Sequence, residues 1–523
     1  MDRMSPLDAS FLHIEDENNH MHIGSVAIFD GPPPEYEDIL SMVRGKLPLV
    51  PRYRQKVRMV PFDLGRPVWV DDAHFHIEYH VRHTALPHPG GPEQLRNLVG
   101  RVMSQQLDRN RPLWSMWVVE GLEDGRWALV SQVHHCMVDG VSGTDLLAVM
   151  LDLEPNPSPP VPDHWQPQAE PSELRLLGDA AVDYLVTPFE QMRGLRRVVR
   201  APRESLARAG EVLGAFRSVM GLASTTGLAT LNGPIGPHRR YNWARGSLAD
   251  VKAVRSALGG TVNDVVLAAI TRGFRDLLIS RGGEVEGCSV RTMVPVSVRL
   301  PGERGTYNNR VSAMFAELPV GIEDPGERLD AIRAQMEDLK ESKQAVAGEV
   351  LTSLSGFAPP MLLSLGMRSA MRFPQNNLHT VTTNVPGPQF PLYAAGRQMR
   401  EAFPYVPIAN RVRIGIAIFS YLGTLNFGVT GDYDTTPDLD VLTHGIEAGI
   451  RELLDCAGVG RGTNGHGHAR VEDTEEVTQP VRARRVAPRR KTATVTAARR
   501  SRGRAASRSG AAPQGGRRGR RSP

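Results

Sequence analysis

The chain has 523 residues, of which 41% are hydrophobic and 23% are charged, and its formal net charge is +5. This length exceeds what one hydrophobic core normally serves, so we expect two domains. The three cysteines, Cys136, Cys288 and Cys456, are widely spaced. This spacing argues against a disulfide framework and a metal knuckle and favours a reducing, cytoplasmic compartment.

Two further features of the sequence bear on location. The N-terminus lacks the pattern of a secretory signal, and no apolar run reaches the roughly 18 residues of a membrane-spanning helix. We therefore expect a cytoplasmic protein whose contact with membranes or lipid inclusions is peripheral.

Residues 1–153 alternate strand-like and helix-like segments. Strands are predicted at 23–29, 114–120 and 127–134, and a helix at 37–47. A helix cap is predicted at 142–145, before the apolar run 146–153.

The clearest chemical signal lies between the last of these strands and that cap. His134, His135, Asp139 and Gly140 form the pattern HHxxxDG. The unperturbed pKa of imidazole lies near neutral pH, so a histidine here can take a proton from an alcohol and pass it on. The glycine permits a tight turn beside it.

Two simpler interpretations of these histidines stand beside the catalytic one. A buried histidine is often only a satisfied core residue, although two of them followed by Asp-Gly favour a site. Neighbouring strand residues point to opposite faces, so the pair is a poor zinc chelator, and no metal site is predicted.

Residues 154–239 are predicted to connect the two domains. The proline cluster at 155–162 marks the boundary. Residues 172–230 are expected to be largely helical, with arginines at 193, 196, 197, 200 and 203 among apolar residues. This pattern is typical either of a helix on an anionic membrane or of a linker helix docked on the protein.

Residues 240–457 are predicted to form a second α/β region. A helix is predicted at 265–278, and strands at 291–300, 379–385, 412–420 and 424–431. Asn263 and Asp264 precede the helix, where they are candidate site residues or an ordinary N-cap. For the apolar stretch 350–373 we prefer a core helix over a channel wall or a membrane-facing patch.

The tail accounts for the positive net charge. Residues 481–523 hold fifteen of the 62 Lys and Arg residues and no Asp or Glu, so residues 1–480 hold 47 basic against 57 acidic residues. We predict disorder over 458–523. The basic tail at 481–523 is a candidate for binding a polyanion, either anionic lipid or nucleic acid, and the alternative is a solvated extension without a partner.

Several motifs together resemble the bacterial wax ester synthase/diacylglycerol acyltransferase family over roughly residues 4–457. In chain order they are Met4-Ser-Pro-Leu-Asp-Ala-Ser-Phe11, Met21-His-Ile-Gly24, Pro112-Leu113-Trp114, HHxxxDG, Asn263-Asp264 and Asn384-Val-Pro-Gly-Pro388. HHxxxDG alone is shared with chloramphenicol acetyltransferases and peptide-synthetase condensation domains. The family often has proline before Met-His, where this chain has His20, a departure that concerns loop shape.

The resemblance implies a fold of two chloramphenicol-acetyltransferase-like α/β domains with the active site in a channel between them. We expect these domains at 1–153 and 240–457, a helical crossover within 154–239, and a disordered tail at 458–523. Each domain would be a sheet with helices on one side.

The resemblance also implies acyl transfer from long-chain acyl-CoA to diacylglycerol. Our hypothesis is direct transfer without an acyl-enzyme, and we expect no bound cofactor beyond acyl-CoA as co-substrate. His135 would be the general base and His134 would shape the channel. Asn263, Asp264 and Asn384 are the candidates for contacting substrate or the oxyanion. Asp139 is expected to pair with Arg299 and hold the motif loop rather than act chemically.

Other functions stay open at this point. Within the family, wax ester formation from a fatty alcohol is the main alternative. A polyketide-associated or condensation-type transferase fed by a carrier protein is a second. A non-catalytic lipid-storage protein and a nucleic-acid-binding protein with a relic domain are alternatives of another class.

Overall fold

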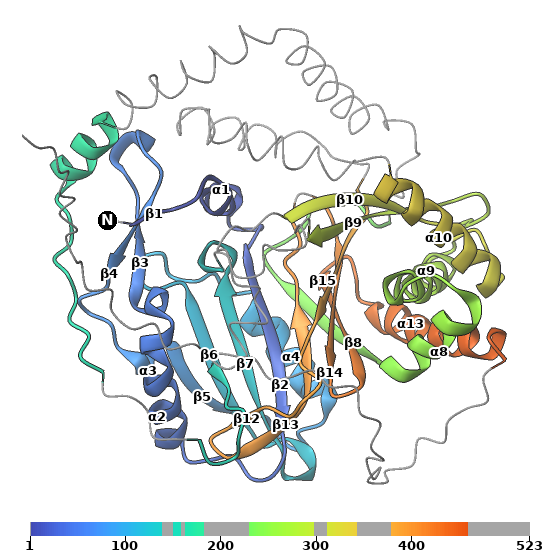
Figure 1. Ribbon diagram of the computed structural model, residues 1–523, viewed down its shortest axis with the longest axis horizontal. Helices are drawn as coiled ribbons and strands as arrows, with labels where there is room; N and C mark the ends of the chain where they lie inside the picture. Colours follow the sequence, from blue (N-terminus) through green and yellow to red (C-terminus); the bar gives the residue numbers. More distant parts are fainter. Residues whose placement is uncertain are drawn as a thin grey trace, which may run out of the picture. The chain divides into compact units, whose positions relative to one another are not determined.

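The computed structural model describes residues 2–138, 150–157, 163–182, 230–297, 311–341, 378–409 and 411–458 (Figure 1). Within these residues the chain forms two six-stranded sheets and one three-stranded sheet, covered by helices. The predicted cap at 142–145, the apolar stretch 350–373, residues 183–229 of the predicted crossover and the tail from 459 lie outside the described residues.

The first large sheet has the strand order β12-β13-β2-β7-β6-β5. Its centre is β2 (His22–Phe29), β7 (Trp127–His134) and β6 (Trp114–Glu120), in which β7 runs antiparallel to the other two. β5 (Val81–Ala85) pairs with β6 in parallel. The three strands predicted in this region are therefore confirmed, with β2 starting one residue earlier than expected.

Helices cover this sheet on both faces, which corrects the expectation of helices on one side. Ala27 and Phe29 of β2 pack in one cluster with α1 (Pro6–Ile14) and α2 (Tyr36–Lys46). Val26 and Ile28 pack in another cluster with α4 (Pro92–Met103). Successive strand residues point to opposite faces, so α4 lies opposite the first two helices.

The last two strands of this sheet come from the C-terminal region. β13 (Arg397–Tyr405) pairs with β2, placing Phe403 opposite Val26, and β12 (Tyr393–Ala394) pairs with β13. The sheet thus takes residues 393–405 from the segment that we expected to form a separate domain. Local patterns cannot reveal this exchange, because the paired strands are hundreds of residues apart.

The second large sheet has the order β10-β9-β11-β14-β15-β8. Its strands are β8 (Arg239–Ser247), β9 (Val290–Ser297), β10 (Val311–Leu318), β11 (Thr380–Pro386), β14 (Ile414–Tyr421) and β15 (Thr424–Asp432). Its helices are α8 (Leu248–Leu258), α9 (Val262–Ser280), α10 (Pro325–Glu341) and α13 (Leu439–Cys456). The strands predicted here are confirmed with ends shifted by one or two residues, and residues 298–300 of the predicted strand 291–300 lie outside the described residues.

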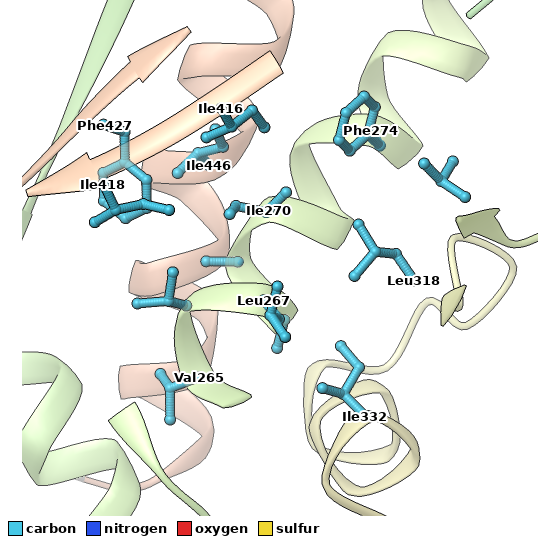
Figure 2. Close-up of a cluster of buried hydrophobic side chains, with 14 of the residues drawn as sticks. Val265, Leu267, Ile270, Phe274, Leu318, Ile332, Ile416, Ile418, Phe427 and Ile446 are labelled. Carbon is cyan, nitrogen blue, oxygen red and sulfur yellow. The ribbon is translucent and has the colours of Figure 1, made fainter. Parts of the chain in front are cut away.

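The core of this half lies between the sheet and α9 (Figure 2). Ile416 and Ile418 of β14 belong to the same buried cluster as Ile270 and Phe274 of α9, and all four side chains are fully buried. Burying one such side chain contributes roughly 1.5–3 kcal/mol, so this layer fixes the helix on the sheet. α9 begins three residues before the predicted helix because Thr261 caps it.

The smaller elements complete the N-terminal half. The three-stranded sheet consists of β1 (Asp2–Arg3), β4 (Val68–Asp71) and β3 (Gln55–Arg58), and α3 (Ile77–His80) precedes β5. Among the described residues, no single helix meets the length and hydropathy expected of a membrane span, although α8 and α9, bent by 104° at their junction, do so when taken together.

Candidate active site

The two histidines of HHxxxDG lie where β7 ends. His134 is the last residue of the strand and His135 begins a 3-10 turn, η5 (His135–Met137). The N–H of His134 donates to Leu113 O at 2.9 Å, and that of His135 donates to Met21 O at 2.8 Å. The Pro-Leu-Trp motif and the Met-His motif therefore each accept a backbone hydrogen bond from the HHxxxDG motif.

His134 caps the turn that carries His135. Its buried ring accepts a hydrogen bond at Nδ1 from the N–H of Cys136, at 3.1 Å. A neutral ring that accepts at Nδ1 carries its proton at Nε2. That nitrogen lies 3.6 Å from Oε1 of Glu15. His134 therefore stabilises the turn through this hydrogen bond. The sequence predicted a role for His134 in shaping the channel, and that role stays a prediction.

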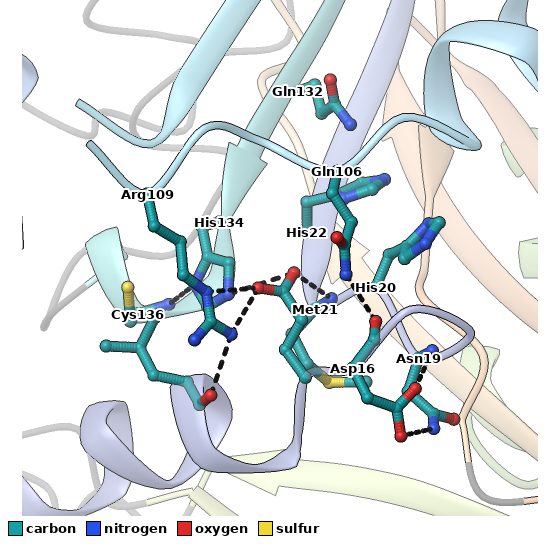
Figure 3. A network of polar contacts seen from close by, with 12 residues as sticks. Asp16, Asn19, His20, Met21, His22, Gln106, Arg109, Gln132, His134 and Cys136 are labelled. Atoms are coloured by element: carbon teal, nitrogen blue, oxygen red, sulfur yellow. Dashed lines mark hydrogen bonds and ion pairs between the residues drawn. The ribbon is translucent and has the colours of Figure 1, made fainter. Parts of the chain in front are cut away.

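Glu15 is a site residue that sequence reasoning missed. Its side chain is only 2% exposed, and Arg109 Nη2 lies 2.8 Å from Oε2. Figure 3 shows Arg109, His134 and Cys136 in this network of polar contacts. Oε1 accepts the N–H of Met21 at 3.2 Å. Burial, the largest influence, would raise the pKa of Glu15, but His134 and Arg109 together lower it to about 2. A carboxylate therefore lies against His134 of the motif. It stands at the C-cap of α1, the helix that contains most of the motif Met4–Phe11.

His135 has a different environment from its neighbour. Its half-buried ring stacks on Phe11 of α1, with ring centroids 4.0 Å apart. Burial lowers the pKa of His135 to about 4, and a hydrogen bond to its own backbone opposes this shift. The imidazole is neutral at pH 7, which is the form that a general base needs.

Two further histidines lie beside the motif. His22 of β2 pairs across the sheet with His134, and its ring is 5.7 Å from those of His20 and Tyr405. Burial lowers the pKa of His22 to about 3. Nε2 of His20 donates to Glu17 O at 3.0 Å. His20, which stands where the family often has proline, therefore stabilises the loop at 17–20. Tyr405 belongs to β13, so the exchanged strand reaches the histidine cluster.

The two asparagines predicted for the site are brought together. Nδ2 of Asn384, on β11, donates to Oδ1 of Asn263, in the first turn of α9, at 3.4 Å. Among the described residues, the amide N–H groups of Asn263 have no hydrogen-bond partner. The predicted oxyanion contact of these asparagines stays a prediction.

Asp264 serves the helix instead. Its Oδ2 accepts the N–H of Thr261 at 2.8 Å, and its own N–H donates to Thr261 Oγ1 at 3.3 Å. This is a complete capping box, the structural alternative that the sequence left open.

The remaining predicted residues, Asp139, Gly140 and Arg299, lie outside the described residues, so the Asp139–Arg299 pair stays a prediction. In the described part of the chain, no three His, Cys, Asp or Glu side chains are grouped so that they could hold a metal ion.

Two models of one protein family match most of the chain. The model of the wax ester synthase/diacylglycerol acyltransferase catalytic domain matches residues 4–266, and that of the C-terminal domain of the same family matches residues 307–454. A putative diacylglycerol O-acyltransferase of Mycobacterium bovis is 38% identical over 456 residues, which cover 87% of this chain and 96% of that protein. A probable diacylglycerol O-acyltransferase of Mycobacterium tuberculosis matches equally well.

Solved structures agree in fold. The wax ester synthase/diacylglycerol acyltransferase from Marinobacter aquaeolei VT8 is 26% identical, with a TM-score of 0.62 over 88% of this chain and 100% of that one. The first condensation domain of the calcium-dependent antibiotic synthetase is 15% identical, with a TM-score of 0.53 over 88% and 96% of the chains. The second likeness concerns fold alone. The predicted two-domain fold of the chloramphenicol-acetyltransferase and condensation-domain type is confirmed.

Proposed function

The chain belongs to the wax ester synthase/diacylglycerol acyltransferase family, and we propose that it transfers long-chain acyl groups from acyl-CoA to diacylglycerol to form triacylglycerol. The observation that carries this proposal is the neutral His135 on a braced turn at the end of β7. The 38% identity to proteins named diacylglycerol O-acyltransferases supports the choice of acceptor.

In the proposed reaction, His135 accepts the hydroxyl proton of the acceptor while the alcohol oxygen attacks the thioester carbonyl. The tetrahedral intermediate collapses with cleavage of the C–S bond, and the imidazolium returns its proton to the departing thiolate. The products are the ester and CoA, and the enzyme is regenerated without a covalent intermediate. Such a base typically contributes about 10²–10⁴-fold to the rate.

The negative charge that develops on the carbonyl oxygen needs hydrogen-bond donors. We assign this role to the amide of Asn263, whose orientation is set by the hydrogen bond from Asn384. One such donor typically contributes about 10²–10³-fold to kcat. Asp264 has no part in this step, because its carboxylate is an acceptor and caps α9.

We place the reaction at a membrane or lipid-inclusion surface, because diacylglycerol and triacylglycerol are lipids. The tail at 481–523 suits such a surface, since each Lys or Arg near an anionic bilayer contributes about 1 kcal/mol. Removing the tail is expected to reduce co-sedimentation with anionic vesicles, most clearly at low salt. Unchanged sedimentation would argue against a lipid-binding role of the tail.

Wax ester formation is the second candidate, and the similarity to the Marinobacter enzyme favours it. The test therefore offers palmitoyl-CoA with diacylglycerol and with hexadecanol separately to the wild type and to His135→Ala. Ester formed by the wild type is expected to fall by about 10²–10⁴-fold in the variant. His238→Ala, at an exposed histidine beside Tyr433, is the matched control. Equal activity of His135→Ala and wild type would remove His135 from the mechanism.

A further inference from the structure

A polar pocket of about 400 Å³ lies beside the histidine motif. Its volume is within the roughly 300–1,000 Å³ typical of small-molecule sites. It is lined by Glu15, Tyr79, Arg82, Gln105, Gln106, Leu107, Asp108, Arg109, Pro112, Trp114, Ser115 and Gln132. Half of these residues lie in the segment between α4 and β6, where the Pro-Leu-Trp motif begins. This composition suits a polar ligand better than an acyl chain.

Arginines supply the charge of this pocket. The Arg82 guanidinium lies 5.0 Å from the ring centroid of Tyr79, and that of Arg111, just outside the lining, lies 3.8 Å from the same ring. Arg109 and Arg111 each have a carboxylate partner, Glu15 and Asp108 respectively. In the described part of the chain, Arg82 has no carboxylate within ion-pair distance. Arg82 and Arg109 offset Glu15 and Asp108 in the lining, so Arg111 beside it gives the described part of this region one surplus positive charge.

The wall beneath these arginines is rigid. Gln132 is 2% exposed, accepts a hydrogen bond from Ser115 Oγ at 3.1 Å, and donates one to Gln105 O at 2.8 Å. Both ends of its amide are therefore held by the protein. A ligand would meet a preformed surface. Within the described ranges, the Arg82 guanidinium makes one hydrogen bond, from Nε to Tyr79 O at 3.1 Å, which leaves its other N–H groups for a ligand.

One residue of the pocket also contacts the motif. Glu15 lines the pocket and also faces Nε2 of His134 at 3.6 Å. A ligand group in the pocket would thus lie close to the motif but not on it. Acyl-CoA has this arrangement, because a flexible pantetheine arm separates its phosphates from the thioester carbon that reacts.

We propose that this pocket binds phosphate groups of the nucleotide end of CoA, through Arg82 and Arg111. The inference rests on the proposed acyl-CoA-dependent function and adds the donor's location to it. Guanidinium groups bind phosphate through paired, charge-assisted hydrogen bonds. The acceptor substrates are uncharged alcohols, so a surplus positive charge in the pocket would not strengthen their binding.

The test compares kcat/KM for palmitoyl-CoA with kcat/KM for the palmitoyl thioester of N-acetylcysteamine, which lacks the nucleotide. In Arg82→Ala and Arg111→Ala, the preference for palmitoyl-CoA is expected to fall by about 10- to 100-fold each. Arg240→Ala is the matched control, because Arg240 also packs on a tyrosine, 4.1 Å from the Tyr433 ring centroid, on β8. An unchanged donor preference in both pocket variants would overturn the proposal.

Competition distinguishes the source of the phosphate. Adenosine 3′,5′-bisphosphate is expected to inhibit the wild type with palmitoyl-CoA, and more weakly the two pocket variants. Stronger competition by phosphatidylglycerol vesicles, or by inorganic phosphate alone, would contradict a nucleotide site. Calorimetric titration of the wild type with adenosine 3′,5′-bisphosphate tests the pocket without turnover. Binding in a protein that forms no ester would therefore defeat the proposed function but not the site.

Discussion

At the scale of single residues, the buried Glu15 carboxylate links stability to pH. The folded-state pKa of about 2 lies below the usual 4.5, so this group contributes stability above pH 4.5 and loses it as the pH falls toward 2. The contribution at neutral pH is roughly 3 kcal/mol. Glu15→Gln is expected to lower the free energy of unfolding at pH 7 and to flatten this acid dependence. Urea unfolding between pH 2 and 7 measures both, and parallel curves for variant and wild type would disprove the assignment.

The lowered pKa of His135 predicts an unusual pH–rate profile. The base must be neutral, so kcat/KM should fall only as the pH drops through about 4, rather than through the usual 6.5. Initial rates between pH 3.5 and 8, with circular dichroism to confirm that the protein stays folded, measure this limb. An acid limb near 6.5 would show that His135 is more solvated in the working enzyme, or that another group titrates.

Sequence reasoning located part of this site, for physical reasons. His134 and His135 were predictable because a β pattern ends in a rare polar motif. Glu15 was not, since its partners Arg109 and His134 are about a hundred residues away and no local periodicity marks it. Asp264 was ambiguous, because an N-cap and a ligand-binding carboxylate have the same local sequence.

At the scale of elements, the contact between α9 and α13 depends on glycines. A Cβ at Gly445 would lie 2.6 Å from Gly273 Cα, a backbone atom that cannot move aside. Gly445→Ala is therefore expected to cost about 1–3 kcal/mol, despite the higher helix propensity of alanine. The control is Gly178→Ala, because nothing lies within 4 Å of a Cβ there. Chemical denaturation compares the two, and equal stability would mean that the helices can separate without cost.

The same helices show how far element prediction reached. The apolar run 265–278 identified α9 correctly, yet its start depended on a side-chain cap that shifts the boundary to Val262. The pairing of β13 with β2 was not predictable, because alternation tells which face of a strand is buried but not which strand lies beside it.

At the scale of the whole molecule, the exchanged strand joins the two sheets into one cooperative structure. Phe403 of β13 is fully buried and stacks on Trp243 of β8, with ring centroids 4.7 Å apart. The same cluster contains Val26 of β2 and Val99 of α4. Its side chains come from both large sheets, so unfolding of one sheet exposes the core of the other.

This shared core predicts one unfolding transition for residues 2–458 rather than two. Phe403→Ala is expected to cost about 3–5 kcal/mol and to shift that transition as a whole. Tryptophan fluorescence and far-ultraviolet circular dichroism should give coincident denaturation curves for wild type and variant. Phe390→Ala, at a side chain that is 52% exposed, should leave the midpoint unchanged. Two separable transitions, of which Phe403→Ala moves only one, would mean that the sheets fold independently and that β13 merely bridges them.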